Sequence, residues 1–73
     1  MSKAIYTKEQ KDLIQKLKSA RLSAKLDQKT AAKRLNKSQS YISKMESGQR
    51  RIDLVQLKQI AQAYSRNIDY FIK

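Results

Sequence analysis

The stretch QKTAAKRLNKSQSYISKMESG, residues 28–48, constrains the fold more than any other part of this chain. Its first half predicts a short helix, Gln28–Leu35. Ala31, Ala32 and Leu35 follow one another at helical offsets of three and four, so one narrow face is apolar while the Lys and Arg side chains point outward.

The second half of the stretch predicts another helix, Gln39–Ser47, separated from the first by a tight turn. Asn36 ends the first helix, because Asn tolerates the left-handed backbone found after helix ends. Ser38 is the expected N-cap of the second helix, and Gly48 closes it.

The outward face of the second helix is unusual for a helix that only packs. We expect it to bury only Ile42 and Met45 and to expose short hydrogen-bonding groups that suit the recognition of a partner at contact distance. The exposed set is Gln39, Ser40, Tyr41, Ser43 and Lys44. Ser and Gln are also common on surfaces without a partner, so the rest of the chain has to decide between these interpretations.

Residues 28–48 resemble the helix-turn-helix of Cro/cI-type (XRE-like) DNA-binding proteins. The likeness rests on Gln28 and Gln39 opening the two helices, Ala32 at the fifth position of the first, and the run Ile42-Ser43-Lys44-Met45-Glu46-x-Gly48. The segment Gln49-Arg50-Arg51-Ile52-Asp53 and residues Leu57, Ile60 and Ala61 extend it, so that it covers about Leu13 to Phe71.

The resemblance implies an all-α fold, a compact five-helix bundle of the lambda-repressor-like DNA-binding type. It also implies that Arg21 pairs with Glu46 and that Gln28 contacts a backbone phosphate from its helix N-terminus. Glu46 is the only acid among residues 28–52, where a free carboxylate would repel phosphate, and this favours the pair over two unrelated surface charges.

Composition limits the chemistry of the chain. With 73 residues it supports one domain, and it contains no Cys, His, Trp or Pro. Disulfides, Cys/His metal sites and Ser-His or Cys nucleophiles are therefore excluded, and we expect no enzyme activity, no metal and no cofactor.

The formal charge of +11 indicates a polyanionic partner. Nucleic acid is the leading candidate, because Lys and Arg that neutralise phosphates release counterions. An anionic membrane surface is the competitor, and high charge alone can serve solubility. No apolar run is long enough to span a bilayer and the start lacks a signal peptide, so we expect a cytoplasmic, nucleoid-associated protein.

We expect an N-terminal arm over residues 1–6 and a single domain over residues 7–73. Thr7 caps a first helix, Lys8 to about Ala24, with Gln10 completing a capping box. Lys25 follows where the family often has Gly, which implies strain or a different cap at that helix end.

Further caps divide the rest of the chain. Asp27 is the expected N-cap of the Gln28 helix, Asp53 that of a fourth helix, Leu54 to about Tyr64, and Asn67 that of a last helix, Ile68–Ile72. The core should include Leu26, Leu57, Ile60, Ala61, Tyr64 and Phe71.

The outward set of the second helix, Gln39, Ser40, Tyr41, Ser43 and Lys44, is expected to read base edges in DNA. Polar and cationic residues around this helix are expected to hold the DNA backbone. This phosphate-contacting set is Gln28, Lys29, Lys37, Ser38, Arg50 and Arg51. Apolar side chains without a core role, Val55, Tyr70 and Ile72, are candidates for a dimer contact.

These features predict a small transcriptional regulator, a repressor, that binds a palindromic operator in double-stranded DNA as a homodimer. Two alternatives remain open at this point. One is an antitoxin-like or other protein-binding regulator in which DNA binding is secondary, and the other is a charge-driven, non-specific nucleic-acid binder.

Overall fold

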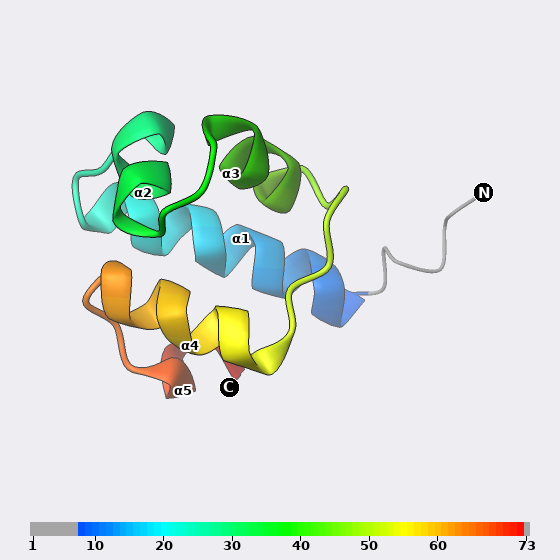
Figure 1. Ribbon diagram of the computed structural model, residues 1–73. Coiled ribbons are helices and arrows are strands. Elements are labelled where there is room, and N and C mark those ends of the chain that lie inside the picture. The colour runs from blue at the N-terminus through cyan, green and yellow to red at the C-terminus, as the bar shows by residue number, and fades with distance from the viewer. Residues whose placement is uncertain (1–7, 73) are drawn as a thin grey trace.

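The computed structural model describes residues 8–72, in which every element is a helix (Figure 1). The helices are α1, Lys8–Ser23; α2, Gln28–Arg34; α3, Gln39–Glu46; α4, Leu54–Ala63; and α5, Ile68–Ile72. The predicted all-α bundle of five helices is therefore confirmed, with α1 to α4 each ending one residue earlier than predicted. The proposed arm and the Thr7 cap lie outside the described residues.

Side chains at the four predicted positions cap the helices that follow them. Asp27, Ser38, Asp53 and Asn67 each accept a hydrogen bond from a backbone N–H in the next turn. Gln56 completes a capping box at α4 by accepting from the backbone N–H of Asp53. The hydrogen bond from Thr30 lowers the pKa of Asp27, because it favours the carboxylate.

Left-handed residues end the first four helices. Lys25, Asn36, Gly48 and Ser65 have φ values of 61°, 58°, 83° and 57°. After each of them the next residue donates its N–H to a carbonyl five positions earlier, which is the hydrogen bond of a Schellman motif. Only one of these four positions carries Gly, so the strain predicted at Lys25 recurs at Ser65.

Three connectors share one backbone pattern, and we call them the first, second and third corner: residues 24–27, 35–38 and 64–67. In each corner the second residue is left-handed, the third makes the Schellman hydrogen bond, and the fourth caps the next helix. The turn of the helix-turn-helix is the second corner, so its geometry is one of three copies.

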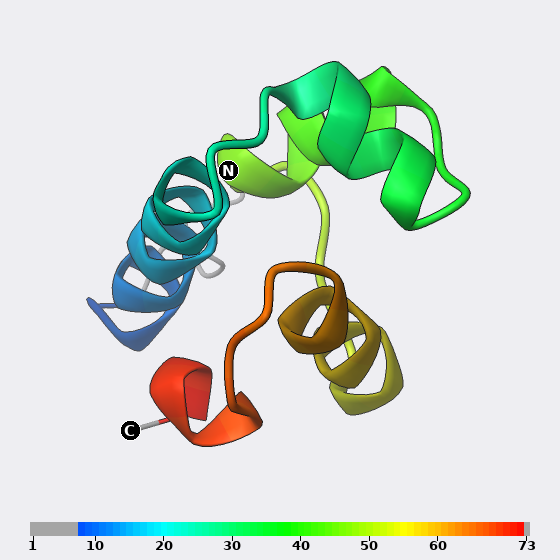
Figure 2. The same ribbon diagram turned by 90° about the vertical axis from the view of Figure 1, so that its left-hand side faces the viewer.

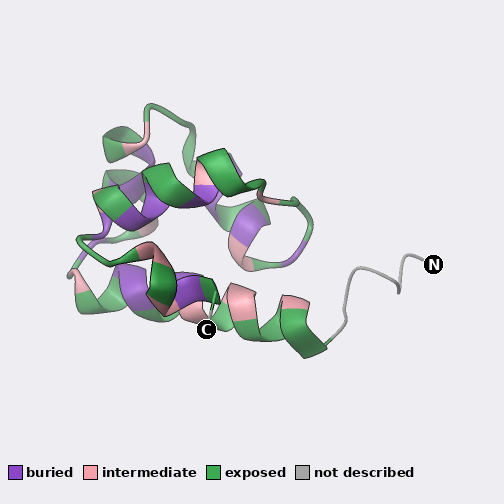
Figure 3. Ribbon diagram, turned by 90° about the horizontal axis from the view of Figure 1, so that it is seen from below, coloured by how far each residue is buried: buried purple, intermediate pink, exposed green. Residues whose placement is uncertain are grey.

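Buried side chains from all five helices form one core. Its largest fully buried members are Leu17, Ile42, Met45, Ile60 and Tyr64. Each helix also carries exposed residues, and the first two turns of α1 carry no buried residue (Figure 3).

The hydroxyl of Tyr64 is buried and has no hydrogen-bond partner among residues 8–72. Burial raises the pKa of this phenol to about 12, because the phenolate would lose its hydration.

The helices divide into two groups joined by α1. In two perpendicular views α2 and α3 lie together above α4 and α5 (Figures 1 and 2). α2 packs on α3, α1 contacts both α3 and α5, and α4 contacts α5. The arrangement leaves one side of α3 open to a ligand while its other side is buried.

Candidate nucleic-acid interface

The open side of α3 carries four of the five side chains predicted to read bases. Gln39, Ser40, Ser43 and Lys44 are all exposed. They line a shallow depression of about 430 Å³ together with Gln28 from α2 and Gln49 from the loop after α3. The surface thus combines three amides, two hydroxyls and one ammonium group. Gln49 was not among the individually predicted contact residues, although it belongs to the segment that carried the resemblance.

Tyr41, the fifth predicted reader, is 8% exposed, so the expectation that α3 buries only Ile42 and Met45 is wrong, although Tyr41 does not belong to the cluster of buried core residues. Two cations lie over its ring: Lys37 Nζ at 5.2 Å and Arg50 Cζ at 4.5 Å from the centroid. A signal for this burial was present, because Tyr41 precedes the buried Met45 by four residues and so shares its helix face.

The Arg21–Glu46 ion pair joins α1 to α3. Arg21 Nε and Nη2 donate to the two carboxylate oxygens at 2.7 and 3.1 Å, and the two side chains are 7% and 4% exposed. Arg21 Nη1 also donates to the carbonyl of Leu26 at 2.7 Å. The hydrogen bonds that Arg21 donates to Glu46 raise the pKa of Arg21, so the charge on this residue is permanent.

The same carboxylate orients Gln28. The Gln28 amide nitrogen donates to Glu46 Oε1 at 3.2 Å, an engagement that was not predicted. A primary amide has two N–H groups, so the second remains able to donate to a phosphate. Glu46 is thus neutralised by Arg21 and positions a donor at the edge of the depression.

The remaining predicted phosphate contacts are exposed around α3. Ser38 uses its hydroxyl oxygen to accept from the Tyr41 N–H, which leaves its own O–H free to donate. The cations of this set, all exposed, are Lys29, Lys37, Arg50 and Arg51. The structure therefore places cations before α3, after α3 and on the neighbouring α2.

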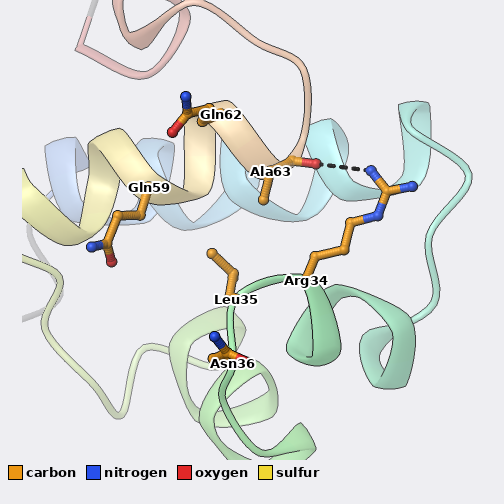
Figure 4. Close-up of a pocket in the computed structure, with 6 residues that line it drawn as sticks. All are labelled: Arg34, Leu35, Asn36, Gln59, Gln62 and Ala63. Atoms are coloured by element: carbon orange, nitrogen blue, oxygen red, sulfur yellow. Dashed lines mark hydrogen bonds between the residues drawn. The ribbon is translucent and has the colours of Figure 1, made fainter.

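A second polar groove, of about 360 Å³, lies between the second corner and α4 (Figure 4). Gln59 from α4 points toward Leu35 and Asn36, Gln62 points away from them, and Arg34 Nη1 donates to the carbonyl of Ala63 at 3.3 Å. This contact ties α2 to the C-terminal end of α4. None of these residues was predicted to belong to the site.

The residues predicted for a dimer contact differ in exposure. Val55 and Ile72 are 64% and 60% exposed. Tyr70 is half-buried, with its ring 5.0 Å from that of Phe71 and the Arg66 guanidinium 4.6 Å from its centroid. Sequence reasoning missed Leu54, which neighbours Val55 and is also exposed.

Among residues 8–72, no three His, Cys, Asp or Glu side chains come together in a way that could hold a metal ion. None of the five helices is long and apolar enough to cross a membrane.

Comparison with known proteins identifies the domain. A family model described as helix-turn-helix matches residues 17–71, which is more than half of the chain. No curated protein matches the sequence of this chain. The matched range contains the ion pair, the depression and all three corners.

Proposed function

The chain belongs to the Cro/cI-type helix-turn-helix family, whose domains bind DNA in regulatory proteins, and we propose that it is a sequence-specific transcriptional repressor. It binds a palindromic operator as a homodimer, in the cytoplasm and on nucleoid DNA. The observation that carries this proposal is the cluster of short polar side chains on the open side of α3, bordered by exposed cations.

α3 has the dimensions for the major groove. An α-helix with its side chains is about 10 to 12 Å across, which fits a major groove of about 12 Å width. The eight residues of α3 span about 12 Å in length, so its first two turns can reach base edges. Gln39 can bind adenine N6 and N7 with its amide, Ser40 and Ser43 can donate or accept, and Lys44 can reach guanine. We leave Tyr41 out of the base-reading set, because its side chain is buried and two cations lie over its ring.

The exposed cations and Ser38 position the domain on the backbone. Gln28, Lys29, Lys37, Arg50 and Arg51 form the rest of this set, and their contacts carry no sequence information. The buried Arg21–Glu46 pair supports the same proposal, since the only acid of residues 28–52 does not face the DNA as a free charge.

A homodimer recognises a longer DNA site than a single α3 can read. Two copies reading inverted half-sites one helical turn apart would double the number of base pairs that are recognised. The exposed Leu54, Val55 and Ile72 support a contact between copies through α4 and α5.

Selection from a randomised duplex library at about 150 mM salt tests the proposal directly. We expect an inverted repeat among the bound sequences. The alternatives predict other results: a charge-only binder would enrich no sequence, and an antitoxin-like regulator would bind a protein partner through the exposed α4 and α5 residues.

Two substitutions separate reading from positioning. Gln39→Ala should relax preference at one base position, at a cost of about 1 to 3 kcal/mol for the preferred base. Arg51→Ala should weaken all duplexes alike and reduce the salt slope by about one. Gln59→Ala, an exposed glutamine on α4, is the control and should change neither. Uniform losses from both site variants would contradict the division of roles.

The dimer is tested by sedimentation of charged variants. Val55→Glu and Ile72→Glu should each shift the protein towards monomer, because a carboxylate would be buried at the contact. Leu22→Glu is the matched control, since Leu22 is a similarly exposed apolar residue on α1. A wild-type protein that stays monomeric with and without DNA would contradict the dimer.

A further inference from the structure

We propose that the Tyr41 ring is the platform of a joint phosphate site, in which Lys37 and Arg50 together bind one phosphodiester group of the DNA backbone. The inference rests on the proposed DNA binding. It assigns Tyr41 the role of a positioning residue in place of base reading.

The two cations reach the same ring from opposite ends of α3. Lys37 lies two residues before the helix and Arg50 four residues after it, yet both charges lie over a ring in the first turn, at 5.2 and 4.5 Å from its centroid. The loop after Gly48 folds back to make this possible, with the N–H of Gln49 donating to the carbonyl of Lys44. Two segments separated by the helix thus meet at one aromatic ring.

The third corner shows which part of this arrangement follows from the turn alone. There Arg66 lies 4.6 Å from the centroid of Tyr70, so the third residue of the corner again covers a tyrosine four positions later. A single cation over such a ring is therefore a local consequence of the corner. The second cation, Arg50, occurs only at Tyr41 among residues 8–72, and it requires the chain to return from the far end of α3.

Electrostatics favours an anion between the two cations. Both charges lie close to one centroid, so they are at most about 10 Å apart, within one Debye length at 0.1 M salt. Within the described part of the chain neither Lys37 nor Arg50 has a carboxylate or hydrogen-bond partner. A phosphodiester relieves their mutual repulsion and accepts hydrogen bonds from both.

The ring is fixed before DNA arrives. Tyr41 is buried, and its backbone N–H donates to the Ser38 hydroxyl at 3.2 Å. Cation–π contact then limits the positions of two long, exposed side chains. Ordering them in the free protein lowers the entropy that is lost on binding.

A double-mutant cycle tests the joint site. The variants are Lys37→Ala, Arg50→Ala and the double variant, each measured for affinity to a random-sequence duplex at about 100 mM salt. We expect each single substitution to weaken binding about fivefold to tenfold, and the double variant to be little weaker than either. Multiplicative losses, within twofold, would overturn the joint site, because the two cations would then act on separate phosphates.

Tyr41 is tested in the same cycle. In the Tyr41→Leu background the coupling between the two cations should disappear, whereas Tyr41→Phe should retain it, because the ring and not the hydroxyl holds them. Coupling that survives Tyr41→Leu would overturn the platform. If Tyr41→Leu does not fold, as judged by its melting curve, the cycle in the wild-type background still decides the joint site.

Arg66→Ala is the matched control, since it removes the same contact from the third corner. It should leave duplex affinity within twofold of wild type, and a loss equal to that of Lys37→Ala would overturn the special role of the second corner. At equal ionic strength, inorganic phosphate should displace the duplex no better than chloride. Displacement that depends on both cations would assign the site to a free anion instead.

Failure of the wild-type protein to bind any duplex would contradict the proposed function itself. Binding with independent losses contradicts only the joint site.

Discussion

The second and third corners have the same backbone conformation, but the helices that follow them have different roles. Both turn the chain with a left-handed residue, Asn36 or Ser65, and both carry a cation over the tyrosine that follows, Lys37 or Arg66. The second corner is followed by an eight-residue helix whose open side is polar, and the third by a five-residue helix that turns Phe71 into the core. Turn geometry therefore sets the direction of the next helix, while the side chains beyond it decide whether that helix meets a ligand or closes the fold.

The largest expected effect on stability concerns the helix that follows each corner. α3, which follows the second corner, is held to α1 by an ion pair, whereas α5, which follows the third corner, is held by apolar packing. Arg21→Ala or Glu46→Ala should lower the free energy of unfolding by about 3 to 5 kcal/mol, because each strands a buried charge. Urea unfolding followed by circular dichroism measures this loss.

The double variant Arg21→Met with Glu46→Leu should recover part of the loss, because no charge is left unpaired. Losses below about 1 kcal/mol for the single variants would instead mean that the pair behaves like a surface salt bridge. The ion pair would then not distinguish the way α3 is held in the fold from the way α5 is held.

The next largest effect on stability concerns the first residue of each corner. This residue is Leu35 in the second corner and Tyr64 in the third corner. The folded protein keeps the Tyr64 phenol protonated up to about pH 12, whereas the unfolded chain releases the proton near its ordinary pKa of 10.0. The contribution of Tyr64 is therefore intact below pH 10 and is lost between pH 10 and 12.

This loss should amount to about 2 to 3 kcal/mol, from two pKa units at about 1.4 kcal/mol each. Denaturant unfolding of wild type and Tyr64→Phe across this pH range isolates it from the other titrating groups. Parallel stability curves for the two proteins would show that the hydroxyl is not buried as described.

The smallest effect concerns the left-handed residues themselves. Ser65→Gly should stabilise the protein by about 0.5 to 1 kcal/mol, because Gly adopts positive φ without steric cost. Asn36→Gly should change stability less, since Asn already tolerates this conformation. Thermal melting of both variants compares the stability gained at the two corners. A larger gain from Asn36→Gly than from Ser65→Gly would contradict the equivalence of the two corner backbones.

Most of the fold could be predicted because its signals are local. Asp27, Ser38, Asp53 and Asn67 were recognised as caps from their residue type and their place before a periodic apolar pattern, and each caps a helix in the structure. Helix ends were placed one residue late, because the residue before each left-handed residue, such as Leu35, Ser47 or Tyr64, is the C-cap and lies outside the helix.

The open side of α3 was predicted less completely, because two of its details depend on distant segments. Tyr41 was expected to face outward. Its place four residues before Met45 is a local signal for burial, but the cover that Arg50 gives its ring comes from beyond the helix and is not encoded in a local pattern. The hydrogen bond between Gln28 and Glu46 joins residues 18 positions apart, and no local pattern encodes it.

The occurrence of the same backbone pattern in all three corners also affects how quickly the chain folds. Each reversal is specified by a stop signal and a start signal within four consecutive residues, so it can form without waiting for distant segments to meet. Helical domains dominated by such local contacts fold in microseconds to milliseconds. The slowest step should then be the docking of α1 onto α3, where Arg21 must find a carboxylate 25 residues away.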